Sequence, residues 1–577
     1  MRLKNSHRKS TLINFAIAFL IRELLASWTG HPWDFEVWVR VGKHVALGGN
    51  PYTILQYDPL ISFSPYKEME SIAYPPLAAY LFAASYLIYT SLNICNRFIY
   101  YFIIKQSMIF SDLITGLMLY KYCKSDVAYL LWLYNPFGIL ISSVWGAIDP
   151  ISILFLFTSL ILLLQGRYFL SGASLGVATA VKGFPIIFLP TIILHSIKEK
   201  KHNAVVEMLL GFTSAFIPSI VIPFMINNWS WNGFYNSSIY QVSLPVYGGI
   251  SPLLVLEYIK EKIPPILHNI ISILWLLVIL AYYITLIINS RELIDSLLMT
   301  TTLFIMSRTF VSEPILLYPI FFAIADYSLQ KRTVSLRRAI SLSIIGLINL
   351  TANNTLLIRF AAPISIHAFN TDIFLNNTAP MATIRLALRE AFALLLFQDM
   401  LAIVFDEEPL LYKVSRILRQ IKYKTLTGYS LFFVSALTLG LGLDLTVIRM
   451  ITDWHYVLNN CYFLGWNLLS VYHLYLALFY IAWIVTITAL RNGNMIIKVK
   501  TFLNLLIIAI FAAGLALPLF QYFRGEQILN GNDLLLIGDL TIDDRMFFVL
   551  TMSAISTLPG ISGLDKLISK PYFKYRR

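Results

Sequence analysis

The chain has 577 residues, of which 58% are hydrophobic and 13% are charged, and its mean hydropathy is +0.70. Soluble globular proteins carry roughly 45–50% apolar and about 25% charged residues, so this composition predicts an integral membrane protein. It excludes an intrinsically disordered chain, a disulfide scaffold and a soluble nucleic-acid binder. The three cysteines are too few and too scattered for a zinc site. A transporter, a channel, a membrane enzyme and a structural subunit remain open.

Long apolar runs predict an all-α, polytopic membrane helical bundle. A bilayer core about 30 Å thick needs roughly 20 apolar residues for each helical crossing, and fewer where a helix breaks, which gives about sixteen crossings. The runs lie at residues 11–28, 98–120, 127–144, 150–165, 168–181, 184–197, 203–226, 266–289, 296–307, 315–328, 339–352, 383–405, 425–443, 468–490, 501–520 and 546–560. The apolar segment Tyr74–Ile88 would invert every later loop if it crossed, so we expect it to lie in or dip into the outer leaflet.

The charges orient this bundle. With both termini in the cytoplasm, the cytoplasmic segments hold 28 of the 44 Lys and Arg residues and eight acids, as the positive-inside rule requires. The net charge of +13 therefore reflects insertion rather than an anionic partner. Sequons for N-glycosylation fall in or beside the loops predicted outside, at Asn228, Asn236, Asn349, Asn353 and Asn376. The basic stretch Lys331–Arg338 divides a front module, residues 1–338, from accessory helices at 339–577.

The first external loop opens with two acids, Asp34 and Glu36. Carboxylates just beyond the outer end of a helix are the arrangement that a general base or a metal-binding pair needs at a membrane surface. The alternative is that Asp34 caps the next helix and Glu36 is solvated. Tyr74 begins a rigid, aromatic-flanked entry to the interfacial segment in the same loop.

The second predicted span contains Lys105 and Asp112, about two turns apart on one helix face. Ionisable residues inside a span are costly and usually face a bundle interior. Two interpretations are equally open here, a buried stabilising pair and a part of a polar cavity.

Further polar residues converge on the external face. Asn135-Pro136 breaks the third span, and the following turn ends at Asp149. Later external turns supply two cations and another acid, namely Lys182, Arg308 and Glu313. Because four separate segments deliver acids and cations to one face, we expect a functional site there.

The order of these motifs resembles the GT-C glycosyltransferases, most closely the catalytic subunit of GPI mannosyltransferase I and its prokaryotic relatives. The resemblance spans about residues 10–330, and the stretches that carry it are Asp34–Glu36, Asn50–Tyr52, Tyr74–Leu77, Lys105–Asp112, Trp132–Asp149, Ser174–Pro185 and Phe310–Ser312.

This resemblance implies an inverting transferase that moves one sugar, mannose in the nearest relatives, from a dolichyl or polyprenyl phosphate to a glycolipid or glycan hydroxyl. Asp34 matches the catalytic base, Glu36 stands where the family often has a second Asp, and Asp149 matches a second external acid. Lys182 matches the Lys before Pro, and it or Arg308 would hold the leaving phosphate. No residue is assigned to a metal, and a divalent cation stays open because of Glu36. The resemblance implies the plasma membrane in a prokaryote and the endoplasmic reticulum in a eukaryote.

Two other functions compete with this one. A secondary transporter or lipid flippase would explain many spans with buried charges, although transporter sites lie near the midplane and the polar motifs here gather at one face. A non-catalytic subunit of a glycosylation complex would tolerate replacement of Asp34 and Asp149.

Overall fold

The structure is a computed structural model, and it describes most of the chain up to residue 413. The described ranges are 2–94, 96–239, 246–289, 291–354, 359–360, 362–363, 381–413, 462–463, 466–467, 533–537 and 540–543.

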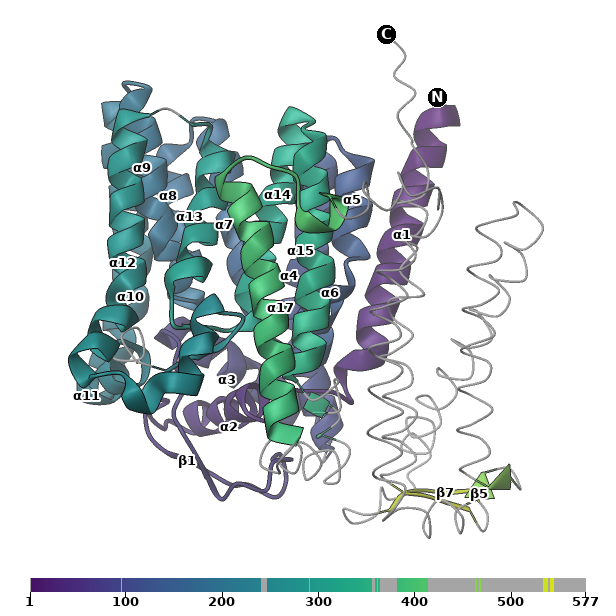
Figure 1. The fold of residues 1–577 in the computed structure, drawn as a ribbon. Coiled ribbons are helices and arrows are strands. Elements are labelled where there is room, and N and C mark those ends of the chain that lie inside the picture. The colour runs from purple at the N-terminus through teal and green to yellow at the C-terminus, as the bar shows by residue number, and fades with distance from the viewer. Residues whose placement is uncertain are drawn as a thin grey trace. The chain divides into compact units, whose positions relative to one another are not determined.

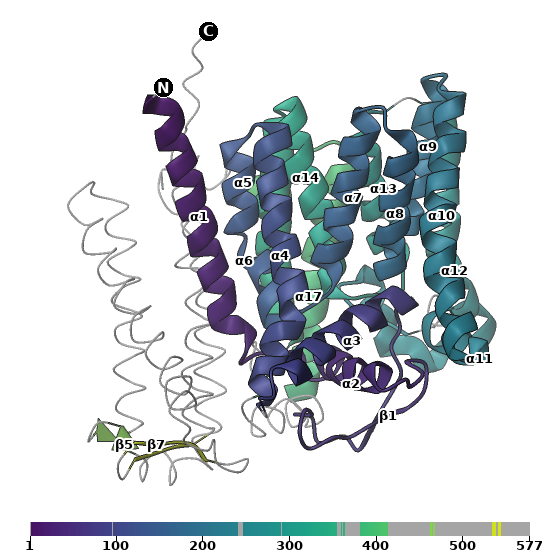
Figure 2. The ribbon, with the colours of Figure 1, turned by 180° about the vertical axis from the view of Figure 1, so that it is seen from behind.

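The first of two structural units, Met1–Asn349 with Thr383–Tyr412, is built from long helices that run side by side (Figures 1 and 2). These helices are α1 (Arg2–Ala26), α4 (Arg97–Cys123), α5 (Asp126–Leu133), α6 (Pro136–Ile139), η1 (Leu140–Trp145), α7 (Asp149–Leu164), α8 (Tyr168–Val181), η2 (Phe184–Ile187), α9 (Phe188–Lys198), α10 (His202–Asn227), α12 (Pro265–Ile288), α13 (Leu293–Ser307), η6 (Glu313–Leu316), α14 (Leu317–Gln330), α15 (Thr333–Asn353) and α17 (Met381–Val404).

Shorter elements lie at one end of this bundle. Helices α2 (Asp34–Ala46) and α3 (Pro76–Ser91) lie across that end beside one another, with α11 (Trp231–Phe234) at its edge (Figures 1 and 2). Small elements complete it, namely β1 (Leu55–Gln56) antiparallel to β2 (Glu68–Met69), β3 (Gly248–Gly249) parallel to β4 (Phe310–Val311), η3 (Tyr235–Ile239) and η5 (Pro252–Lys262). The placement of α3 fits the expectation that residues 74–88 do not form a crossing.

The second unit comprises Leu350–Ala382 and Lys413–Arg577. Its described strands form two antiparallel pairs, β5 (Tyr462–Phe463) with β6 (Trp466–Asn467) and β7 (Asp533–Ile537) with β8 (Leu540–Asp543). The four crossings predicted after residue 424 lie outside the described residues. The division of the chain at residue 338 stays a prediction.

The lengths and the apolar composition of the helices indicate a membrane protein. Within the described residues, α4, α10, α12 and the first 18 residues of α15 are long and apolar enough to cross a membrane, and the bent pair of α5 with α6–η1 would make a fifth span. Helices α7, α8, η2–α9 and α13 are apolar but shorter. The helical class is therefore shown, whereas about sixteen crossings remain a prediction.

The predicted break at Asn135-Pro136 is confirmed. Pro136 begins α6 because it lacks an amide hydrogen to continue α5, and the Asn135 Oδ1 accepts a hydrogen bond from the Phe137 amide at 3.0 Å. The Asn135 Nδ2 donates to Ser343 Oγ of α15 at 2.9 Å, which fixes the break against a neighbouring helix. The two segments meet at 45°, and the π-helix η1 then ends at Gly146 with a φ of 78°. This bend directs the following turn toward α7.

Helices α8 and α10 pack backbone to backbone through glycines. A Cβ at Gly172 would lie 2.0 Å from the Met208 carbonyl oxygen, and one at Gly211 would lie 1.9 Å from that of Phe169. Gly172 and Gly176 form a G-x-x-x-G pattern, which in membranes lets two helices approach closely enough for backbone contact. At these glycines the pair of helices α8 and α10 is therefore held by close backbone contact rather than by large side chains.

We expect Gly172→Ala to lower the melting temperature of the purified protein by several degrees, because the helices must separate and overpacking costs about 1–3 kcal/mol. Gly138→Ala is the matched control, since the nearest atom to its Cβ would be the Asn135 Cβ at 3.6 Å. Thermal unfolding in detergent measures both. Equal melting temperatures for the two variants would contradict the close approach.

Candidate functional site

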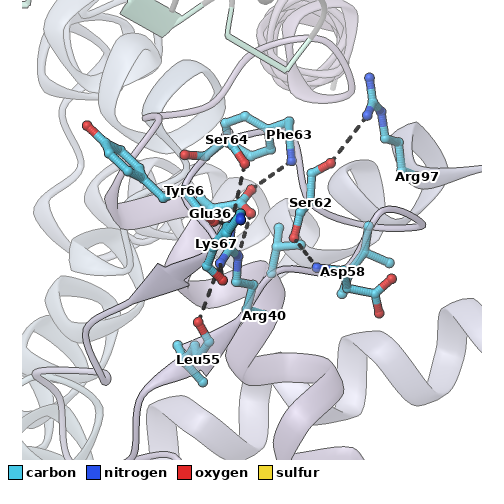
Figure 3. A network of polar contacts seen from close by, with 12 residues as sticks. Glu36, Arg40, Leu55, Asp58, Ser62, Phe63, Ser64, Tyr66, Lys67 and Arg97 are labelled. Carbon is cyan, nitrogen blue, oxygen red and sulfur yellow. Dashed lines mark hydrogen bonds and ion pairs between the residues drawn. The ribbon is translucent and has the colours of Figure 1, made fainter. Parts of the chain in front are cut away.

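Glu36 lies in a buried network at the start of α2 that holds the loop between α2 and α3 (Figure 3). Its Oε1 accepts from Arg40 Nε at 2.6 Å, and its Oε2 accepts from the Phe63 amide at 3.0 Å. The Arg40 guanidinium also donates to carbonyl oxygens of the loop, including that of Tyr66 at 2.8 Å. Glu36 is thus neither solvated nor part of the acidic pair that we expected with Asp34. It is the anchor of the loop.

Asp34 is the first residue of α2 and is 32% exposed. Its Oδ2 accepts from Trp145 Nε1 at 3.1 Å, so the end of η1 meets the start of α2. His31 stacks on Trp145 with ring centroids 4.3 Å apart, and its Nδ1 accepts from the Asp34 amide at 3.1 Å. An Nδ1 that accepts from a backbone amide carries no proton, so His31 is held as the Nε2–H tautomer. Asp34 thus sits at a helix N-terminus, where the helix dipole favours a carboxylate.

Asp149 and Lys182 form a buried ion pair between α7 and α8. The Lys182 Nζ lies 2.6 Å and 2.7 Å from the two carboxylate oxygens of Asp149, which is 1% exposed. The Lys182 Nζ also lies 5.7 Å from the ring centroid of Tyr74. Burial raises the pKa of Tyr74 well above its ordinary value, and the charges of Asp34 and Asp149 raise it further, so its hydroxyl stays protonated. The structure therefore brings Asp34, Tyr74, Asp149 and Lys182 into one cluster.

Lys105 joins the segments that carry this cluster. Its ammonium group is fully buried and donates to the carbonyl oxygens of Thr29 at 2.5 Å, Ser143 at 2.7 Å and Val144 at 3.2 Å. The same group lies 4.7 Å from the centroid of the Phe35 ring. Lys105 thus fixes the loop before Asp34 against the end of η1.

Asp112 pairs with Arg22 of α1, not with Lys105. The Arg22 Nε lies 2.9 Å from Asp112 Oδ2, and both side chains are buried. Trp132 Nε1 donates to the Asp112 carbonyl oxygen at 2.9 Å. Lys105 and Asp112 therefore stabilise two different contacts, and the interpretation that they pair with each other is wrong.

Arg308 lies in another environment, just beyond α13. Its Nε donates to the Phe310 carbonyl oxygen at 2.9 Å, and its guanidinium lies within 6 Å of the rings of Trp275 and Phe304. Burial lowers its pKa to about 10, which leaves it charged at neutral pH. These contacts hold Arg308 to its own turn and to α12 and α13.

Asp149 is poorly placed to act as a general base. Both oxygens of Asp149 accept from Lys182, so this acid is occupied and this cation is neutralised. Among the residues that the structure describes, no group of three or more His, Cys, Asp or Glu side chains could hold a metal ion. Asp149 and Lys182 are buried and join α7 to the end of α8, and Asp34 is the more exposed acid of the cluster.

Two partner residues, Arg22 and Arg40, were not predicted from the sequence. Arg40 follows Glu36 by four residues on one helix, and that spacing is a detectable signal for an ion pair. Arg22 lies 90 residues from Asp112, and nothing local in the sequence predicts that pairing.

Residues 60–252 match the family model of the GPI transamidase subunit PIG-U. The matched part contains five of the predicted site residues, namely Tyr74, Lys105, Asp112, Asp149 and Lys182. It covers less than half of the chain and leaves out Asp34, Glu36 and Arg308. No curated protein matches the chain.

This match overturns the predicted kinship with GT-C mannosyltransferases. The matching family is a subunit of a transamidase, so glycosyltransferase activity, a polyprenyl-phosphate sugar donor and Asp34 as the base of sugar transfer are not supported. The alternative of a non-catalytic subunit fits better, although the complex is a transamidase rather than a glycosylation complex.

We expect Lys182→Met to destabilise the protein by about 3–5 kcal/mol, because it leaves the buried Asp149 carboxylate without its cation. The double variant Asp149→Asn/Lys182→Met removes both charges and should recover a large part of that loss. Thermal unfolding in detergent measures the series.

Lys201→Met is the matched control, because its pair with Glu199 is solvent-exposed. It should leave the melting temperature unchanged. A double variant no more stable than Lys182→Met would show that the charge pair is not the source of the effect.

Proposed function

We propose that this protein is a non-catalytic subunit of a GPI transamidase complex, with the role of PIG-U. The match of residues 60–252 to the PIG-U family carries this proposal. The matched range includes α3, α4, α7, α8 and α10, which form the part of the bundle around the Asp149–Lys182 pair.

The charges of the cluster support a structural and binding role. A general base must accept a proton from its substrate. Here Lys182 occupies Asp149, and Arg40 with the Phe63 amide occupies Glu36. Groups engaged in this way hold elements in place, and they leave the bond-breaking chemistry of the complex to another subunit.

The proposal implies which partners the protein has and in which membrane it lies. A transamidase replaces one amide bond with another by transfer to an amine, so the complex must bring a GPI lipid to a protein. The proteins that receive a GPI anchor carry a hydrophobic tail of about 10–20 residues. A multi-pass bundle in the endoplasmic reticulum membrane suits both substrates, and the cluster of Asp34, Tyr74, Asp149 and Lys182 would contact the polar headgroup of the lipid. Other subunits of the complex are its protein partners.

The orientation belongs to the same proposal. Both termini face the cytoplasm, and the end of the bundle that carries α2 and α3 faces the lumen. Residues 1–338 form the module that contains the cluster, and the helices predicted in 339–577 are accessory.

Depletion of the protein in its own cells should abolish attachment of GPI to a reporter protein and should leave fully mannosylated GPI lipids to accumulate. A missing transamidase subunit blocks the last step, whereas a missing mannosyltransferase would truncate the lipid. Thin-layer chromatography of labelled lipids, together with surface display of the reporter, distinguishes the two results. Truncated lipids would refute the proposal.

Re-expression of Asp34→Asn supplies the control within the same cells. A subunit without a catalytic base should restore at least half of the reporter display, since the amide keeps an oxygen for the Trp145 hydrogen bond. Affinity purification of tagged wild-type protein should also recover transamidase activity. A preparation that lacks this activity counts against membership of the complex.

A further inference from the structure

The five sequons differ sharply in exposure. Asn349 is 0% exposed within α15, and Asn353 near the end of that helix is also buried. An N-linked glycan is bulky and requires a surface position, so neither can carry one. These two sequons therefore lend no support to the predicted topology. Asn376 lies outside the described residues, and the two exposed sequons are Asn228 and Asn236.

The backbone conformation at position 228 favours an asparagine there. It terminates α10 with a φ of 51°, in the left-handed region that Asn tolerates better than most residues. The 26 residues of α10 extend about 39 Å at 1.5 Å per residue. That length exceeds the hydrocarbon core of about 30 Å and ends within the headgroup layer, which reaches a total thickness of about 40–45 Å. If α10 crosses the membrane from its first turn, Asn228 lies at the membrane surface, where a glycan has little room.

Asn236 lies eight positions further along, in η3, and its side chain is exposed. This element is fixed to the first external loop. The Phe234 ring packs edge-on against that of Tyr52 at 5.0 Å, and the Tyr52 hydroxyl donates to the Tyr74 carbonyl oxygen at 3.1 Å. Asn236 is thus presented by a folded surface element at the same end of the bundle as the cluster.

We propose that Asn236 is an N-glycan acceptor and that it marks this end of the bundle as lumenal. In the reaction the Asn236 Nδ2 bonds to the anomeric carbon of a polyprenyl-diphosphate-linked oligosaccharide. The bond from that carbon to the diphosphate oxygen breaks, the polyprenyl diphosphate leaves with the bonding electrons, and the proton lost by the amide passes to a base of the transferring enzyme. This inference rests on the endoplasmic reticulum location in the proposed function.

A glycan at Asn236 would also show which side of the membrane the cluster faces. Tyr52 links Asn236 to Tyr74, so a glycan at Asn236 places Tyr74, Asp149 and Lys182 on the lumenal side as well. A polar lipid headgroup would then have to reach the cluster from the lumen.

The test is expression of the tagged full-length chain in a eukaryotic host that N-glycosylates lumenal proteins, followed by endoglycosidase digestion of membranes. In a background that carries Asn376→Gln, the protein should show one increase in gel mobility on digestion, and addition of Asn236→Gln should remove it. Ser238→Ala destroys the sequon and keeps Asn236, so it should also abolish the increase, whereas Ser238→Thr should retain it. Addition of Asn228→Gln or Asn349→Gln should leave the increase unchanged.

The proposal is overturned if the Asn376→Gln background shows no mobility change, or if the change persists after addition of Asn236→Gln. Size-exclusion chromatography of each variant shows whether loss of the glycan comes from misfolding. Co-purification of transamidase activity from the same membranes separates the two proposals. Activity without a glycan overturns only the Asn236 site, and a glycan without activity overturns only the assignment to the complex.

Discussion

The buried ammonium group of Lys105 is the contact on which the cluster depends. It donates to carbonyl oxygens at the end of the α1–α2 loop and at the end of η1, two segments that are more than 100 residues apart in the sequence. A charge inside a membrane bundle is costly unless its hydrogen-bonding capacity is filled, and three carbonyl oxygens fill it here. A Cβ at Gly146 would lie 2.9 Å from Lys105 Cε, so the turn after η1 can follow this path only with glycine. Asp34 and Trp145 meet because Lys105 holds the segments on which they stand.

Much of the fold could be predicted from hydrophobic runs and a few breakers. The expected apolar runs before residue 406 coincide with described helices. The break at Asn135-Pro136 lies where predicted because proline has no amide hydrogen to donate. The convergence of Asp34, Asp149 and Lys182 at one end followed from topology. A single sequence carries no information about which helix a buried charge faces. Lys105 and Asp112 share a helix face and still pair with different partners.

The function was harder to predict because short motifs specify residue types and leave their pairing open. An acid after the first helix, an acid in the next turn and a lysine before proline are required equally by a transferase site and by a scaffold. The family match decides against the transferase, and the contacts show only what single acids do: Asp149, the second predicted acid, has both oxygens within 2.7 Å of one ammonium group. Glu36 shows the same ambiguity, because the residue that stands in for a second catalytic acid instead binds Arg40 and the Phe63 amide. Both assignments required coordinates.

The buried ion pairs account for the rigidity that a subunit without chemistry of its own would need. Arg22 with Asp112 joins α1 to α4, Lys182 with Asp149 joins α8 to α7, and Arg40 with Glu36 holds the first external loop. Each pair recovers only part of the free energy lost on burying its charges, so it adds little to stability compared with apolar contacts. What it adds is specificity, because any other arrangement would leave a charge buried alone. A bundle whose helices can slide would present its external loop in many positions. These pairs select one position, and they do so with the same acids and cations that in a different arrangement would form a catalytic site.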